Sequence, residues 1–269
     1  MVGMTTRREG PAGPRRARPQ GKRERFRRGP PRGEGDDRVV LYGWHPVMQA
    51  LANEGRSLHR LLATENALAR LTEAVGSLRV VPELVRPSAI NALLGPDAVH
   101  QGLYLEADAL PAPDLDALPD DALLLALDQI TDPHNVGAIV RTAAAFGVAG
   151  IVTTARHSPN ATGVMAKSAS GGLEHVPLVI VRNLAEALIE LGERGFTRIG
   201  LDSEAETSLD AVGPKRPAVI VLGAEGKGLR QRTRETCDVL ARIDFTGEIR
   251  SLNVSNAAAI ALYALRPRA

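Results

Sequence analysis

The stretch that decides the fold runs from Asp128 to Ala143 and reads DQITDPHNVGAIVRTA. It follows the apolar run Ala122 to Leu127, which has the length and composition of a buried strand. The Asp132-Pro133 pair marks a turn, and apolar residues at helical spacing follow Asn135. The segment therefore predicts a strand, a polar turn and a helix.

Polar residues in this segment are candidates for a site. Asn135 is a favoured N-cap, and Gly137 would let a ligand or another backbone approach the first helical turn. Arg141 lies four residues after Gly137, so it is expected on the same helix face. An amide and a cation would then face one crevice, although an ordinary capped helix with an exposed arginine explains the same residues.

The second half of the chain alternates between strand-like and helix-like segments. This alternation predicts an α/β domain with a mainly parallel sheet covered on both faces, whose ligands bind beyond the carboxyl ends of the strands. The expected strands are 122–128, 150–154, 176–181, 197–201, 218–222 and 239–243, and the expected helices are 136–146, 162–171, 184–194 and two that begin near 229 and 254.

A smaller α/β unit is predicted to precede this domain. Its strand-like segments are VVLY, LHRLLAT, LRVVPE and LYLEA, separated by helical segments that include ENALARLTEAVG and PSAINALLG. His45 and His100 lie beside turns of this unit, and we interpret both as structural. The predicted organisation is an arm at 1–37, a small domain at 38–106, an acidic proline-rich linker at 107–121 and a large domain at 122–269.

Charge is divided unevenly along the 269 residues. Residues 1–38 contain 12 Lys and Arg against 5 Asp and Glu, whereas the remainder contains 21 against 26. The arm is rich in Arg, Gly and Pro, so we expect it to be disordered when free and to attract phosphate backbones, or else to act only as a solubilising tail. The single cysteine, the lack of a membrane-length apolar run and the lack of a secretion signal predict a cytoplasmic protein without membrane association.

Two further glycine-rich or polar turns lie near the C-terminus, in VIVLGAEGKGL at 219–229 and IDFTGEIRSLNVSNAAA at 243–259. Neither fits a Rossmann or Walker A fingerprint, which weakens the interpretation of the chain as a nicotinamide or nucleotide enzyme. Ser255 is expected to cap the last helix. No cluster of Cys and His has metal-ligand spacing, so no metal is predicted.

Together, DQITDPHNVGAIVR, GAEGKGL and SLNVS resemble in residues, order and spacing the motifs of the SpoU class of the SPOUT superfamily. The small domain, with YG-x-HPV and HQG, resembles the substrate-binding domain of many such enzymes. The family consists of RNA ribose 2'-O-methyltransferases that use S-adenosylmethionine, work as homodimers and have a deep trefoil knot. The resemblance implies the same knot, cofactor, RNA partner and homodimer here.

The resemblance also implies the site residues. The cofactor would be held by Leu222, Gly223, Gly226, Ile243 and Leu252, with Glu225 helping to hold the site together. Ser251 and Asn253 would line the reacting ribose, while Asn135 would orient Arg141. The family pattern gives Arg141 the task of positioning the target phosphate or accepting the proton; because a guanidinium keeps its proton to about pH 12, we favour phosphate binding and charge stabilisation.

The branch that methylates a guanosine of large-subunit ribosomal RNA is the most similar. A transfer RNA guanosine 2'-O-methyltransferase and a catalytically silent RNA-binding or ribosome assembly factor of the same fold are the alternatives. KSASGG at 167–172 has the small residues of a pocket wall in this class and is expected to lie behind the site, although close helix packing explains it equally well. Asp244 and Phe245 depart from the family pattern of a proline and an apolar residue, which affects the shape expected for the adenine pocket.

Overall fold

The computed structural model describes residues 38–155, 163–249 and 251–266. The predicted arm therefore lies outside the described residues. The elements of the first part are β1 (Arg38–Tyr42), α1 (Trp44–Ala52), β2 (Leu58–Ala63), α2 (Glu65–Val75), β3 (Pro82–Leu84), α3 (Pro87–Leu94) and β4 (Leu103–Asp108).

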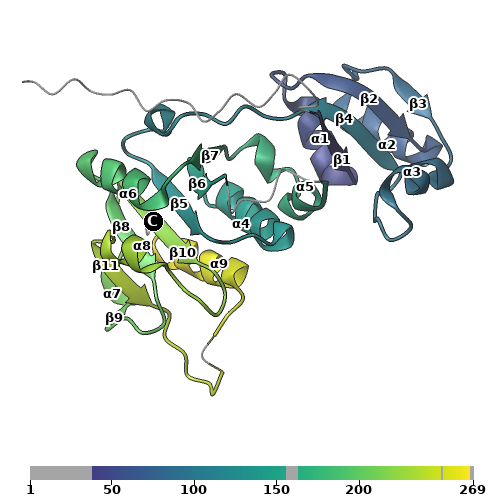
Figure 1. The fold of residues 1–269 in the computed structure, drawn as a ribbon. Helices are drawn as coiled ribbons and strands as arrows, with labels where there is room; N and C mark the ends of the chain where they lie inside the picture. The colour runs from purple at the N-terminus through teal and green to yellow at the C-terminus, as the bar shows by residue number, and fades with distance from the viewer. Residues whose placement is uncertain (1–37, 156–162, 250, 267–269) are drawn as a thin grey trace, which may run out of the picture. The chain divides into compact units, whose positions relative to one another are not determined.

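The first part forms a four-stranded mixed sheet in the order β1-β4-β2-β3 (Figure 1). The β1-β4 and β4-β2 pairs are antiparallel and the β2-β3 pair is parallel. Leu61 and Leu105 pack with α1 and α2 in one apolar cluster, whereas Leu62 and Tyr104 pack with Ile90 of α3 in another. The two sheet faces therefore bury different apolar residues.

The second part begins with the 3-10 turn η1 (Leu115–Ala117). Its further elements are β5 (Leu123–Asp128), α4 (Pro133–Ala145), β6 (Gly150–Thr154), α5 (Gly163–Ala169), the 3-10 turn η2 (Gly172–Glu174), β7 (Leu178–Val181), α6 (Leu184–Glu193), β8 (Thr197–Leu201), β9 (Thr207–Ser208), α7 (Leu209–Val212), β10 (Ala218–Gly223), α8 (Gln231–Glu235), β11 (Val239–Arg242) and α9 (Val254–Ala264).

The seven strands of this part form one sheet in the order β7-β6-β5-β10-β8-β11-β9, and all described pairs are parallel. The predicted α/β class, with a parallel sheet behind a smaller α/β unit, is confirmed. Strands β5 and β10 are neighbours although about 90 residues separate them in the sequence, with Gly223 opposite Asp128. The knot stays a prediction.

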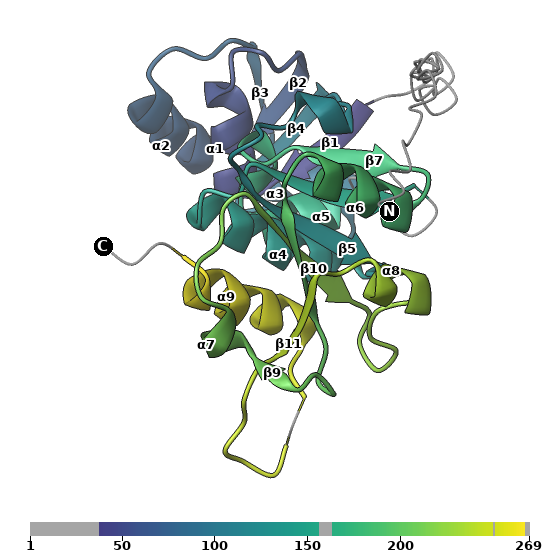
Figure 2. The same ribbon diagram turned by 90° about the vertical axis from the view of Figure 1, so that its left-hand side faces the viewer.

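Helices cover both faces of the parallel sheet. Along β5, Leu123, Leu125 and Leu127 face a core shared with α4 and α9, while Leu124 and Ala126 face a core shared with α6. This alternation is the period of two that a strand imposes on its side chains, and every residue of β5 is buried. Helix α9 lies beside α4 in both views (Figure 1, Figure 2).

Some elements differ from the sequence-based expectation. Strand β3 is confined to Pro82–Leu84, and β4 continues to Asp108. Leu115 and Leu118 both lie within the expected acidic linker, yet they are buried in the core on the α6 side of the sheet. The acidic and proline-rich composition of this segment predicted a linker, so the burial of these two leucines was not expected. The short elements β9 and α7 were not predicted, because a two-residue strand has no periodicity to detect.

A buried ion pair connects the loop after α1 to η2. The Arg56 Nη1 lies 3.2 Å from Glu174 Oε1, and each side chain is 4% exposed. The second oxygen of Glu174 accepts a hydrogen bond from Asn53 Nδ2 at 2.7 Å. Both oxygens of the buried carboxylate are thus satisfied, as a buried charge requires.

Candidate active site

A pocket of about 270 Å³ lies where β8, β10 and β11 reach their carboxyl ends. This is the edge at which parallel α/β sheets bind ligands, and the volume is close to the lower end of small-molecule sites, about 300 Å³. The lining residues are Leu201, Asp202, Ser203, Leu222, Gly223, Ala224, Glu225, Gly226, Gly228, Ala241, Ile243, Phe245, Ser251, Leu252, Val254 and Ala257.

The turn after β10 forms one wall of this pocket. The Gly228 amide donates to the Ala224 carbonyl at 2.8 Å, which closes the turn. Gly226 and Gly228 have φ angles of 74° and 65°, a region that favours glycine. A Cβ on Gly223 would lie 2.3 Å from the carbonyl carbon of Gly228, so no side chain fits there. The glycines allow the backbone of the turn to fold back on itself.

A polar network joins three segments that are distant in sequence. Asn135 Nδ2 donates to Glu225 Oε1 at 3.3 Å, and Asn253 Nδ2 donates to Asn135 Oδ1 at 2.8 Å. The same Glu225 oxygen accepts the backbone amide of Val254 at 3.1 Å. The first turn of α4, the glycine-rich turn and the start of α9 are therefore held together beside the pocket.

Family models match both parts of the chain. A model described as SpoU rRNA Methylase family matches residues 122–263, and one described as RNA 2'-O ribose methyltransferase substrate binding matches residues 40–113. The chain belongs to the SpoU rRNA Methylase family. The resemblance stated from the three motifs is thereby confirmed.

Relatives support the same family. A "23S rRNA (guanosine-2'-O-)-methyltransferase RlmB" from Ralstonia nicotianae is 39% identical over 242 residues, which cover 85% of this chain and 96% of the relative. An "uncharacterized tRNA/rRNA methyltransferase" from Mycobacterium marinum is 36% identical over 265 residues, covering 94% and 84%. The SpoU methyltransferase AviRb from Streptomyces viridochromogenes, solved with AdoMet, has the same fold with a TM-score of 0.72, 24% identity and coverage of 85% and 89%.

The structure of this SpoU family member brings most of the predicted site residues together. All five residues predicted to hold a cofactor line the pocket, namely Leu222, Gly223, Gly226, Ile243 and Leu252. Glu225 and Ser251 line it as well, and Asn135 and Asn253 adjoin it through the polar network. The sequence thus predicted that these residues lie together, whereas their individual roles stay predictions.

Arg141 is the predicted site residue that the structure does not bring into this group. Its side chain is exposed, and it neither lines the pocket nor joins the network. Gly137 and Arg141 do lie on neighbouring turns, but the Gly137 position is closed by α5. A Cβ there would lie 2.5 Å from Ser168 Cβ and 2.6 Å from the Met165 carbonyl oxygen. The close approach that Gly137 permits is therefore that of α5 rather than of a ligand.

Both predicted helix caps were wrong. Asp132 caps α4 by accepting the His134 amide at 3.0 Å, because the helix already begins at Pro133. Asn253 caps α9 by accepting the Ser255 amide at 2.8 Å. The side chain of Asn135 is thereby free for Glu225 and Asn253. In each case two residues of good capping type lie within three positions of each other, and residue type alone does not say which of them caps the helix.

Lys167 of the KSASGG segment contacts the small domain, and His100 is hydrogen-bonded within that domain. Lys167 Nζ donates to Gln101 Oε1 at 2.9 Å, and burial lowers the pKa of Lys167. His100 Nδ1 accepts the Gly102 amide at 3.0 Å and its Nε2 bonds to Asn91 Oδ1 at 3.0 Å. These contacts agree with a structural role for His100.

Sequence reasoning missed the pocket residues at the end of β8 and directly after it. Leu201, Asp202 and Ser203 line the pocket, and they lie at the end of a strand predicted at the correct place. Position at the end of a parallel strand was the signal that could have found them. Phe245 supplies an aromatic wall, while Asp244, the other departure from the family pattern, accepts Arg242 Nε at 2.8 Å.

Metal-binding clusters and membrane-length helices are both absent from the described residues. Within 38–155, 163–249 and 251–266, no group of three or more His, Cys, Asp and Glu is placed to hold a metal ion. Likewise, no helix in this part of the chain is long and apolar enough to cross a bilayer.

Proposed function

We propose that this protein transfers a methyl group from S-adenosylmethionine to the ribose 2'-hydroxyl of a guanosine in large-subunit ribosomal RNA. The observation that carries the proposal is the Asn135–Glu225–Asn253 network, which holds three family motifs together beside one pocket. The named activity of the Ralstonia relative, 39% identical across most of both chains, supports the guanosine and the 23S RNA.

The pocket residues fit the cofactor chemically. Leu222, Ile243, Leu252 and Phe245 offer apolar walls for an adenine ring, and the folded-back turn offers backbone groups for its polar edge. The carboxylate of Glu225 suits a ligand that carries a positive charge. When bound, S-adenosylmethionine supplies an electrophilic methyl group on a sulfonium.

The chain's own residues have to orient the RNA and to stabilise the negative charge that develops on the 2'-oxygen as the hydroxyl loses its proton. Ser251 lines the pocket and Asn253 adjoins it; both are exposed, and their polar groups suit hydrogen bonding to a ribose. Arg141 is exposed and, within the described residues, has no ion pair to break before it binds a phosphate. The guanidinium keeps its proton, so it would stabilise the negative charge that develops on the 2'-oxygen.

The test is methyl transfer from tritiated S-adenosylmethionine to separate preparations of 23S RNA, 16S RNA and transfer RNA, followed by mapping of 2'-O-methylated nucleotides. We expect label in 23S RNA at a guanosine. Label confined to transfer RNA would replace the proposal with a transfer RNA methyltransferase. Absence of cofactor binding by calorimetry would replace it with a silent RNA-binding or assembly factor.

We also propose that the protein works as a homodimer in the cytoplasm. Ile260 and Tyr263 lie three residues apart on α9 and are 40% and 59% exposed, which supports an apolar contact surface on that helix. Sedimentation at micromolar protein concentration measures the oligomeric state directly.

A further inference from the structure

Two carboxylate–arginine pairs flank the turn that forms the pocket wall. On the β5 side, Asp128 is fully buried, with 0% exposure, at the carboxyl end of the strand. Its Oδ2 accepts the Arg230 backbone amide at 2.9 Å, and its Oδ1 accepts Arg230 Nε at 2.6 Å. Arg230 stands two residues after Gly228, so this pair fixes the end of the turn.

On the β8 side, Asp202 binds the helix that follows the turn. Its Oδ2 lies 3.1 Å from Arg234 Nη1 in α8, and its Oδ1 accepts the Glu204 amide at 2.9 Å. Because β10 lies between β5 and β8, the exit of the turn is attached to both neighbouring strands. The entrance of the turn, at Gly223, is itself paired with Asp128 along the β5-β10 register.

We propose that Asp128, acting through Arg230, is a positioning residue for cofactor binding, with the Asp202–Arg234 pair as a second anchor. A buried carboxylate needs both of its donors, so the Asp128–Arg230 pair holds the backbone after Gly228 in one place before any ligand arrives. A turn that is already ordered saves the ligand the entropic cost of ordering it. This inference rests on the proposed cofactor pocket but concerns two residues to which the family resemblance gave no role: Asp128 opens the first motif, and Arg230 directly follows the second.

The same sheet contains a matched control. Asp238 accepts the Arg198 backbone amide at 2.8 Å and Arg198 Nε at 3.0 Å, which repeats the chemistry of the Asp128 pair. This pair lies where β8 and β11 begin, at the edge opposite to the pocket. Asp238→Asn therefore removes a carboxylate–arginine pair with the same donors without touching the turn, although the Asp238 side chain is 41% exposed and that of Asp128 is buried.

The experiment compares Asp128→Asn, Arg230→Gln and Asp238→Asn with the wild type by calorimetry with S-adenosylmethionine and by steady-state kinetics. We expect the first two variants to weaken cofactor binding by about tenfold, equal to about 1.4 kcal/mol. KM for the cofactor should rise while kcat at saturating cofactor and KM for RNA stay near wild type. Asp238→Asn should bind within about twofold of wild type, and Arg230→Lys should recover part of the loss.

Unchanged cofactor affinity in Arg230→Gln would overturn the inference. An equal loss of cofactor affinity in Asp128→Asn and Asp238→Asn would also overturn it, because the loss would then not be specific to the turn. A general loss of folded protein would lower apparent kcat and leave the affinity unchanged. If Asp128→Asn does not fold, as judged by circular dichroism, Arg230→Gln decides, since it keeps the buried carboxylate and the backbone donor. Failure of the wild type to bind S-adenosylmethionine would instead refute the proposed function.

Discussion

At the scale of single residues, Arg141 is exposed and lies outside the proposed cofactor pocket. The pocket lining contains the glycine-rich turn and the residues around Leu252, but not Arg141. No described residue forms an ion pair with its guanidinium. A cation in this state is available for an incoming phosphate at little desolvation cost.

We therefore expect Arg141→Ala to reduce methylation of RNA at least about 100-fold, as loss of a charge-stabilising group does, with cofactor affinity near wild type. Tritium transfer and calorimetry measure the two quantities. Lys215→Ala, an exposed cation before β10 at the opposite sheet edge, is the control and should retain activity. Parallel loss of cofactor binding and methylation would assign Arg141 to the cofactor pocket or the fold.

A second residue-scale consequence concerns His100. Its Nδ1 accepts the Gly102 amide, so this nitrogen carries no proton in the folded protein. Burial, and then the charge of Lys167, lower the pKa of His100 below its usual value. The unfolded chain binds a proton more readily at this site, so the stabilising contribution is present above the unfolded pKa of about 6.5 and is lost as pH falls through the lowered folded value.

Comparison of wild type with His100→Gln tests this sign. The difference in free energy of unfolding between the two proteins should be largest near pH 7.5 and should shrink as the pH is lowered toward about 5. Urea unfolding at several pH values measures it, and the remaining histidines are common to both proteins. A difference that stays constant with pH would contradict a neutral, hydrogen-bonded His100.

At the scale of elements, α4 depends on α5 for its position. Gly137 lies at the contact, where a Cβ would lie 3.0 Å from the Ala169 backbone nitrogen as well as closer to Ser168 and Met165. Two of these three contacts are backbone atoms, which cannot rotate away. Because α4 also carries Asn135, any shift of this helix moves the polar network.

Gly137→Ala should therefore destabilise the protein by about 1–3 kcal/mol through overpacking, although alanine is the better helix former. Gly55→Ala is a suitable control, since its Cβ would meet only Asn53 Oδ1 at 3.4 Å. Chemical denaturation measures both. Equal stability of Gly137→Ala and wild type would mean that the α4–α5 contact relaxes freely.

The elements also show where sequence reasoning succeeds and where it stops. The six long strands of the parallel sheet were predicted from apolar segments, which are continuous in β5 and β10 but interrupted by polar residues in β8. The start of α4 was placed too late because both Asp132 and Asn135 are good caps, and only the first accepts an amide. Strand β3 was drawn too long because the preceding residues are apolar without being paired.

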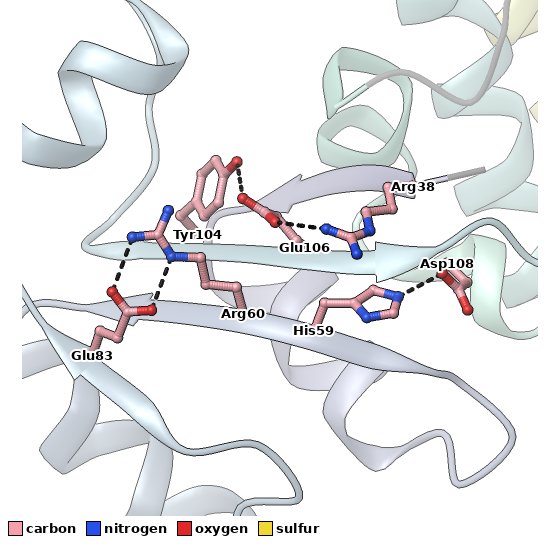
Figure 3. A network of polar contacts seen from close by, with 7 residues as sticks. All are labelled: Arg38, His59, Arg60, Glu83, Tyr104, Glu106 and Asp108. Carbon is pink, nitrogen blue, oxygen red and sulfur yellow. Dashed lines mark hydrogen bonds and ion pairs between the residues drawn. The ribbon is translucent and has the colours of Figure 1, made fainter. Parts of the chain in front are cut away.

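At the scale of the whole molecule, the N-terminal arm and the rest of the chain carry charge of opposite sign. Residues 39–269 contain 21 Lys and Arg against 26 Asp and Glu. In the small domain, several arginines are already engaged: Arg60 pairs with both oxygens of Glu83 and Arg38 lies 3.9 Å from Glu106 (Figure 3). Arg79 donates to backbone carbonyls at the end of α1. This surface offers few cations to RNA.

Deletion of residues 1–37, which removes 11 Lys and Arg, should therefore weaken RNA binding by at least about tenfold at physiological salt. It should also flatten the dependence of log affinity on log salt by about 0.7–0.9 for each phosphate that the arm neutralises. Filter binding over a salt series measures both. A full-length chain in which these cations are replaced by Gln should behave like the deletion. RNA affinity that stays unchanged in both variants would mean that the arm is only a solubilising tail.

The sequence by itself determined the six long strands of the parallel sheet, the three motifs and the family, because apolar segments, helix periodicity and glycine-rich turns are local properties. Only the tertiary structure decided which side chains meet. Asn135 reaches Glu225 because β5 and β10 are neighbours across about 90 residues of chain, and Asp128 reaches Arg230 for the same reason. Strand order results from packing of the whole core, and no local pattern encodes it.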